Sequence, residues 1–243
     1  PQAFLRDASF LGSMLNAHAT TGGTTGVPLK LVRSPESVVA EQACQDEGVR
    51  QLGLDPRKAR MAVLRGDDIK DPSDTSPPYW IHAMGGKRLI FSSNHLSEHT
   101  AAHFIEALRA FRPDLLWVYP TTLEALCLLV QKTGAKLHVP AVMSSSEVLS
   151  SDVWRFAERL LGCRLFDRYG QAERVACAHA FSVEEYRFVP GYAHVELIVD
   201  SQDESSVFYE IVGTSLWNTA MPLVRYRTGD LIRLPRSYGE REI

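Results

Sequence analysis

Residues 115–143 read LLWVYPTTLEALCLLVQKTGAKLHVPAVM, and this stretch decides the fold class. Leu115–Tyr119 is a continuous apolar run of the kind that parallel sheets bury on both faces. Thr121–Thr133 has helical character and is followed by Gly134, a residue type that commonly ends helices. Val139–Met143 is the next apolar run. The stretch therefore predicts a strand, a helix and a second strand in succession.

The same alternation extends outward in both directions. Further strands are predicted at residues 29–32, 61–64, 89–91 and 164–169, and further helices at residues 35–52, 97–111 and 150–161. Ser34 and Ser97 are placed to cap two of these helices. Residues 65–86 are rich in Asp, Pro and Gly and are expected to form a long loop. The alternation predicts an α/β fold with a mostly parallel sheet flanked by helices.

The pattern changes after Tyr186. Residues 195–199, 207–212 and 231–234 are predicted strands with no helix between them, which indicates a smaller antiparallel β portion. We therefore expect two parts, an α/β core over residues 1–185 and a β-rich subdomain over residues 186–243.

Composition excludes several classes of protein. The 243 residues hold 26 Lys and Arg against 29 Asp and Glu, and the resulting net charge of −3 argues against a general nucleic-acid binder. No apolar run approaches the roughly 20 residues that span a bilayer, and residues 1–15 lack the pattern of a signal peptide. The four cysteines are scattered and fit neither a disulfide framework nor a CxxC pair, so a cytoplasmic location is expected.

Seven consecutive residues from Thr20 to Gly26 are Gly or Thr. Glycine lets the backbone approach an anion closely, and successive N–H groups together with Thr hydroxyls form an anion-binding concavity. The segment suits polyphosphate, although it lacks the Gly-x4-Gly-Lys-Ser/Thr spacing of a Walker A loop. Taken alone, it is interpreted equally well as a phosphate-binding loop and as a plain polar loop.

Two further motifs follow this segment in order. Residues 167–173 read DRYGQAE, and residues 221–230 read MPLVRYRTGD. The three segments resemble the phosphate loop, the Tyr-Gly-x-x-Glu motif and the Thr-Gly-Asp motif of the adenylate-forming (acyl-activating) enzyme superfamily. In detail they are most similar to the phenylacetate–CoA ligase branch and its CapK-like group, over about residues 20–234.

The resemblance implies an ATP-dependent carboxylate–CoA ligase of the AMP-forming type. Such an enzyme would join a small-molecule carboxylic acid to AMP, with ATP and Mg²⁺ as cofactors, and pass the acyl group to CoA or a carrier-protein thiol. The chain would be the nucleotide- and acyl-binding core and the β-rich subdomain ending near the hinge, and the mobile C-terminal domain would be absent from it. A homodimer is left open. The alternative is a degenerate, non-catalytic ATP-binding module of the same fold.

The resemblance also implies three groups of site residues. The expected nucleotide-binding residues are Thr20, Thr21, Gly22, Gly23, Thr24, Thr25, Gly26, Ser146, Glu147, Tyr169, Gly170 and Asp230. The expected catalytic residues are Glu173, which would bind Mg²⁺, and Arg227, which would contact a phosphate or the ribose. The substrate pocket is expected to contain His95, Tyr119 and Ser145.

Each motif also has a purely structural alternative. Tyr169 is suited to close a strand as a core aromatic, and Glu173 is suited to lie near a helix N-terminus. Residues 228–230 alone are typical of a hairpin turn, and the serines at 144–146 are typical of a helix cap.

Cys177 and His179 raise the question of zinc. They match positions of a structural zinc site in some relatives of the phenylacetate–CoA ligase branch. Residues 233–243 lack the cysteine pair that usually completes that site, so no zinc is expected.

Overall fold

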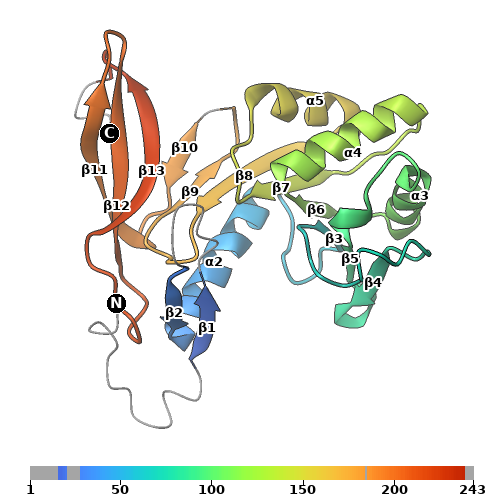
Figure 1. Cartoon of the computed structure of the whole chain (residues 1–243), viewed down its shortest axis with the longest axis horizontal. Helices are drawn as coiled ribbons and strands as arrows, with labels where there is room; N and C mark the ends of the chain where they lie inside the picture. The colour runs from blue at the N-terminus through green and yellow to red at the C-terminus, as the bar shows by residue number, and fades with distance from the viewer. Residues whose placement is uncertain (1–15, 21–27, 184, 239–243) are drawn as a thin grey trace. The chain divides into compact units, whose positions relative to one another are not determined.

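The computed structural model describes residues 16–20, 28–183 and 185–238 (Figure 1). Most strands belong to one eight-stranded sheet. Its members in chain order are β3 (Met61–Leu64), β4 (Trp80–Ala83), β5 (Arg88–Phe91), β6 (Leu115–Val118), β7 (Ala141–Ser145), β8 (Arg164–Gly170), β9 (Cys177–Ala180) and β10 (Tyr186–Phe188). Their order across the sheet is β10-β9-β8-β7-β6-β3-β5-β4.

Two smaller sheets complete the strands. β1 (Ala17–Thr20) pairs antiparallel with β2 (Lys30–Arg33). β11 (Ala193–Gln202), β12 (Ser206–Ser215) and β13 (Tyr226–Pro235) form a three-stranded antiparallel sheet. The helices are α2 (Pro35–Gln51), α3 (Ala101–Phe111), α4 (Pro120–Thr133) and α5 (Ser151–Leu161), with single turns η2 (Met84–Gly86) and η3 (Ser93–His95).

The large sheet is mostly parallel, which confirms the predicted fold class. β3 pairs parallel with β5 and β6, and the pairs β6–β7 and β7–β8 are also parallel. The edge strand β4 runs antiparallel to β5. The predicted antiparallel portion is confirmed by β11–β13.

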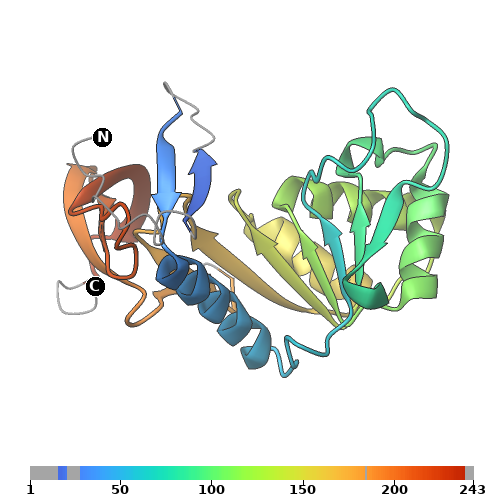
Figure 2. The ribbon, with the colours of Figure 1, turned by 90° about the horizontal axis from the view of Figure 1, so that it is seen from below.

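Alternate residues of the buried strands pack on opposite faces of the sheet. Ala62 and Leu64 belong to a core cluster that they form with side chains of α3, α4 and α5. Met61 and Val63 belong to a second cluster, which includes Leu52 just beyond the end of α2. Both faces of β3 are therefore covered, as expected for a continuous apolar strand of a parallel sheet. Figure 2 shows α3, α4 and α5 on one side of these strands.

Particular residues determine where the helices begin and end. Pro120 occupies the first turn of α4, and Gly134 ends it with a left-handed φ of 65°. The helix predicted from Ser97 starts later, at Ala101. The reason is that the Thr100 hydroxyl donates to the His95 carbonyl and accepts from the Ser97 amide, which holds a turn before the helix.

Four described strands, β1, β4, β9 and β10, lie where the sequence indicated none, and β4 and β9 show the reason most clearly. β4 interrupts the predicted loop of residues 65–86 and pairs with β5 at the edge of the sheet. β9 is buried along its whole length, but it consists of small and polar residues rather than β-branched ones. Neither strand carries the alternating or continuous apolar pattern that identifies strands in a sequence.

Two glycines permit close approaches that a side chain would block. A Cβ atom on Gly48 of α2 would collide with the Phe166 ring of β8. A Cβ atom on Gly213 of β12 would collide with the backbone carbonyl of Val175. The second contact is with backbone, which cannot move aside as a side-chain tip can.

The chain divides into two compact units. One contains residues 1–45, 169–178 and 188–243, and the other contains residues 46–168 and 179–187. The division of 1–185 from 186–243 that the sequence suggested stays a prediction about domains. Within the described ranges, no helix is both long and apolar enough to cross a bilayer.

Candidate active site

The Thr-Gly-Asp motif forms a bulge in β13. Glu210 of β12 faces Leu231 and Val212 faces Arg227, so residues 228–230 lie opposite the single residue Ile211. Gly229 takes a φ of 76°, a conformation that side chains disfavour. The Thr228 hydroxyl donates to the Ile211 carbonyl and accepts from the Asp230 amide, at 2.8 and 3.0 Å. The bulge thereby fixes the backbone that carries the Asp230 carboxylate.

Asp230 is bonded to Tyr169, the last residue but one of β8. The Tyr169 hydroxyl donates to Asp230 Oδ2 over 2.7 Å and accepts from Gln171 Nε2 over 2.6 Å. Burial, together with the Asp230 charge, raises the pKa of Tyr169 well above its usual value, so the phenol stays a donor. The structure thus brings together two predicted nucleotide-binding residues, while Gly170 ends the strand between Tyr169 and Gln171.

Glu173 is oriented by a second tyrosine. The Tyr226 hydroxyl donates to Glu173 Oε1 over 2.9 Å, and burial and this carboxylate raise the pKa of Tyr226 to about 12. Within residues 28–183 and 185–238, no Lys or Arg forms an ion pair with Glu173. Carboxylate oxygens are ligands that Mg²⁺ prefers. The residues present therefore fit the expected metal.

Arg227, the other predicted catalytic residue, is engaged elsewhere. Its Nε donates to Glu210 Oε2 over 2.7 Å, and its Nη2 contacts the same oxygen. This ion pair raises the pKa of Arg227 and lowers that of Glu210. The pair bridges β12 and β13 beside the bulge, so Arg227 stabilises the strand that carries Asp230.

The Gly/Thr segment is described only at its first residue. Thr20 ends β1 and lies opposite Lys30 of β2 in the antiparallel ladder. The predicted phosphate-binding residues Thr21, Gly22, Gly23, Thr24, Thr25 and Gly26 lie outside the described residues.

The predicted pocket residues lie at the carboxyl ends of neighbouring parallel strands. His95 follows β5, Tyr119 follows β6, and Ser145 ends β7. These strands and β3 between them run parallel, so we call this end of β3, β5, β6 and β7 the carboxyl edge. Ligands of open α/β sheets typically bind outside the carboxyl ends of the strands.

His95 is a buried and oriented imidazole. Its Nδ1 lies 2.8 Å from the Ser92 hydroxyl, and its ring stacks on Tyr79 with a centroid distance of 5.4 Å. Its Nε2 is buried and has no hydrogen-bond partner among the described residues. A nitrogen in this state is available to a polar group of a ligand.

Glu147 and the serines before it shape the end of β7. Glu147 Oε2 accepts from the Thr121 amide over 3.0 Å, so the carboxylate caps the start of α4. Ser145 Oγ accepts from Trp117 Nε1 over 3.2 Å. Ser146 has a φ of 77°, an uncommon conformation for a residue with a side chain and one that is concentrated at functional sites.

Arg65 belongs to the same edge but was not singled out in the sequence. It follows β3 directly, and its guanidinium carbon lies 3.8 Å from the centroid of the Trp117 ring and 5.5 Å from that of Tyr119. The signal that could have found it is a cation placed immediately after a buried apolar strand, where the chain reaches the carboxyl edge.

Asp167 is a buried acid of β8 that the sequence also left without a role. Its Oδ2 accepts a short hydrogen bond from the Tyr186 hydroxyl, and its Oδ1 has no partner among the described residues. Burial raises the pKa of Asp167 above its usual range, although the Tyr186 bond opposes this shift.

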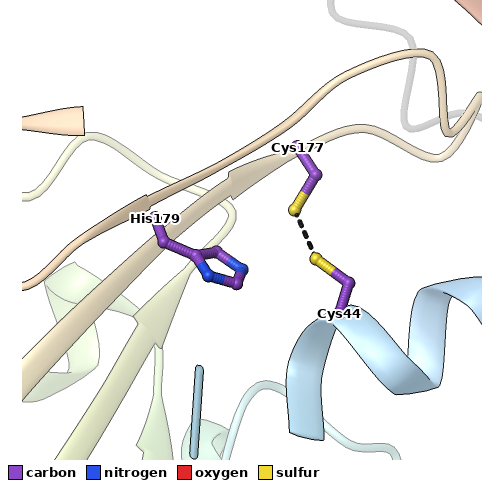
Figure 3. A group of neighbouring side chains, drawn as sticks. All are labelled: Cys44, Cys177 and His179. Atoms are coloured by element: carbon purple, nitrogen blue, oxygen red, sulfur yellow. Dashed lines mark hydrogen bonds between the residues drawn. The ribbon is translucent and has the colours of Figure 1, made fainter. Parts of the chain in front are cut away.

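Cys44 joins Cys177 and His179 in a separate group of metal-ligand side chains (Figure 3). Cys44 Sγ of α2 lies 2.9 Å from Cys177 Sγ of β9. His179 lies two residues further along β9, and the ligand atoms of the three buried side chains lie within 4.8 Å of one another. Thiolate and imidazole are the ligands that zinc prefers, whereas structural zinc sites almost always have four. From the sequence, only Cys177 and His179 were examined as possible zinc ligands, because Cys44 is distant from them in the chain.

The family is decided by a match over most of the chain. The sequence profile described as AMP-binding enzyme matches residues 74–240. The chain belongs to the AMP-binding enzyme family. The superfamily inferred from the three motifs is thereby confirmed.

Two relatives have the names of the two groups that the motifs resemble, CapK and phenylacetate–CoA ligase. Protein CapK of Staphylococcus aureus is 21% identical over 232 residues, which cover 92% of this chain and 50% of CapK. Phenylacetate-coenzyme A ligase of Pseudomonas putida is 29% identical over 160 residues, which cover 62% of this chain and 36% of the ligase. The chain spans half or less of the length of these relatives.

Solved structures of AMP-binding enzymes share the fold. A 2-hydroxyisobutyryl-CoA ligase in complex with 2-HIB-AMP and CoA superposes with a TM-score of 0.61 at 14% identity, covering 95% of this chain and 48% of the ligase. An anthranilate CoA ligase in complex with anthranoyl-AMP gives a TM-score of 0.56 at 17% identity, covering 88% of this chain and 44% of that one. The predicted architecture of an adenylate-forming core is thus confirmed.

Proposed function

We propose that the protein containing this chain activates a carboxylic acid as an acyl-adenylate and then transfers the acyl group to CoA or a carrier thiol. The observation that carries the proposal is the hydrogen bond from Tyr169 to Asp230, which joins two motifs 61 residues apart. Membership in the AMP-binding enzyme family supports the same reaction class.

The nucleotide would be held mainly by one compact unit. Asp230 would accept hydrogen bonds from the ribose hydroxyls, since a carboxylate offers two oxygens. The Tyr169 ring would stack against the adenine, and Gly170 leaves that strand end without a side chain. Backbone and hydroxyl donors of residues 20–26 would hold the phosphates, and Ser146 and Glu147 are proposed to lie beside the base.

Glu173 would bind the Mg²⁺ that accompanies ATP. When bound, the ion would neutralise phosphate charge and favour departure of pyrophosphate. Tyr226 supports this role because its hydroxyl fixes one carboxylate oxygen and leaves the other available. Arg227 acts through Glu210 and β13 in our proposal, rather than by touching the nucleotide.

The reaction itself requires positioning more than covalent chemistry by the protein. A carboxylate oxygen of the substrate forms a bond to the α-phosphorus, and the bond from that phosphorus to the bridging oxygen breaks. Both electrons of the broken bond leave with pyrophosphate. His95, Tyr119 and Ser145 at the carboxyl edge would orient the acid.

The thiol acceptor, location and assembly belong to the same proposal. CoA is the proposed acceptor, since the relatives and fold neighbours include CoA ligases. A cytoplasmic location agrees with the supply of ATP and CoA there. A homodimer stays a prediction, which light scattering of the purified full-length protein tests.

Carboxylate-dependent exchange of labelled pyrophosphate into ATP tests the proposed reaction. We expect the full-length natural protein to show exchange with at least one acid of a broad panel, and only when Mg²⁺ is present. ATP binding without exchange for any acid contradicts the proposal and favours the alternative, a non-catalytic ATP-binding module of the same fold.

A further inference from the structure

Arg65 is held rigidly at the carboxyl edge. It follows Leu64 of β3, a strand whose four residues are all buried. Its guanidinium stacks on Trp117, whose indole nitrogen in turn donates to Ser145. The next residue, Gly66, donates its amide to the Ser93 hydroxyl over 3.1 Å. The arginine is therefore fixed from both its side chain and its backbone.

The Arg65 cation lacks a counter-charge at ion-pair distance. Burial lowers its pKa below the usual value, and Arg168 adds to this shift. Tyr119 and Asp67 oppose this lowering of the pKa. No carboxylate among the described residues lies within 4.0 Å of the Arg65 guanidinium, so Arg65 forms no ion pair there. Its Nε is buried without a hydrogen-bond partner. A partly desolvated charge with an unused donor is costly unless a ligand completes it.

Guanidinium is suited to one kind of ligand. Its planar fork donates two parallel hydrogen bonds to a carboxylate, phosphate or sulfonate. The Trp117 ring lies against the guanidinium and the Tyr119 ring lies further away, with 3.8 and 5.5 Å between the guanidinium carbon and the ring centroids. The Nε–H has no partner among the described residues, so this donor remains for such an anion.

We propose that Arg65 binds a second acidic group of the substrate, so that the preferred acids carry an anionic group besides the carboxylate that reacts. This inference rests on the proposed function and names its substrate class. The second group is favoured because the reacting carboxylate loses its negative charge when it bonds to phosphorus. An arginine paired with it would then again lack a counter-charge, whereas a second acidic group keeps its charge throughout.

Arg60 provides a matched control at the opposite end of β3. Its guanidinium carbon lies 4.6 Å from the centroid of the Phe111 ring, so it is also an arginine on an aromatic face. It is exposed, and it precedes the strand instead of following it. A substitution of Arg60 therefore shows the effect of losing any arginine stacked on a ring. A substitution of Arg65 shows, in addition, the effect of losing the cation at the carboxyl edge.

The test compares paired acids in the full-length natural protein. Benzoate is paired with terephthalate and para-sulfobenzoate, and hexanoate is paired with adipate, in pyrophosphate exchange. We expect at least one doubly acidic member to exceed its partner about 10- to 100-fold in kcat/KM, the range of one charge-assisted interaction. Arg65→Gln should remove this preference through the KM of the doubly acidic acid, Arg65→Lys should restore part of it, and Arg60→Gln should keep it.

Calorimetric binding of the same acids without ATP separates the two proposals. If no acid supports exchange but a doubly acidic one binds the natural protein more tightly than Arg65→Gln, the proposed function fails and the inference about Arg65 stands. If monocarboxylic acids exchange and the natural protein shows no preference within any pair, the inference is overturned and the proposed function stands. Equal loss for both members of each pair in Arg65→Gln also overturns the inference.

Discussion

Tyr169 donates a 2.7 Å hydrogen bond to Asp230, although 61 residues separate them in the chain. The bond joins the end of β8 to the bulge of β13, so two motifs that lie far apart in the sequence are in direct contact. Burial and the Asp230 charge raise the pKa of Tyr169, so the phenol stays protonated and serves as the donor. The carboxylate is oriented before any nucleotide arrives.

Removing this bond should weaken ATP binding while leaving the ring for stacking. In Tyr169→Phe we expect the KM for ATP to rise about tenfold, since a hydrogen bond to a charged group contributes about 1.5–3 kcal/mol. Pyrophosphate exchange at varied ATP measures this. Tyr238→Phe, which removes an exposed hydroxyl near the end of the described chain, should have no effect. An unchanged KM in Tyr169→Phe would contradict the role given to Asp230.

Glu173→Gln should change the metal requirement rather than the acid specificity. The amide keeps the hydrogen bond with Tyr226 but loses the charge that attracts Mg²⁺. In Glu173→Gln we expect the Mg²⁺ concentration for half-maximal exchange to rise about 100-fold. In Tyr226→Phe we expect a rise of about tenfold, because this change only frees the Glu173 carboxylate to rotate. Titration of Mg²⁺ at fixed ATP measures both. Identical Mg²⁺ curves for the natural protein and Glu173→Gln would exclude a metal-binding role.

The sequence predicted the parts of the fold that its local chemistry dictates. Residues 115–118 and 61–64 are apolar and buried on both faces, and Pro120 and Gly134 delimit the helix between two strands. It missed β4 because that strand is defined by its pairing with β5, not by its own pattern. It missed β9 because four small or polar residues give no strand signal even when all are buried.

The candidate site was predicted only as far as the motifs reach. Tyr169 and Asp230 were found because they stand in recognisable motifs, and the structure brings them together. Arg65 could not be found in this way, because it stands in no motif. It is distinguished by its lack of an ion-pair partner among the described residues and by its contact with the Trp117 ring, and both depend on the fold. Cys44 was missed for a similar reason, since only folding brings it to Cys177.

Asn218 should prove essential for the stability of the unit that carries Asp230. Its Oδ1 accepts from the amides of Ser34 and Met221, and its Nδ2 donates to the Val32 carbonyl over 3.0 Å. In Asn218→Ala we expect a loss of about 1–3 kcal/mol for each buried group left without a partner. Urea unfolding measures this, with the exposed Gln202→Ala as control. A loss no larger than that of the control would show that water replaces the amide.

Asp167→Asn should alter the pH dependence of stability in a defined direction. The folded-state pKa of Asp167 is raised above its usual value of 3.8 because the carboxyl is buried. The folded state then binds the proton more tightly than the unfolded state, so stability falls as pH rises from 3.8 through the folded-state pKa. Asn cannot ionise, and its side-chain oxygen still accepts from Tyr186.

The free energy of unfolding of Asp167→Asn minus that of the natural protein should therefore increase as pH rises through this window and level off above it. Urea unfolding of both proteins from about pH 3.5 to about pH 7 measures the difference, and the shared titration of all other groups cancels. Gln202→Ala, a change at an exposed position that carries no titratable group, should give a difference that is flat with pH. A difference for Asp167→Asn that falls as pH rises would mean that the ionised carboxylate is the stabilised form, with hydrogen bonding from Tyr186 outweighing burial.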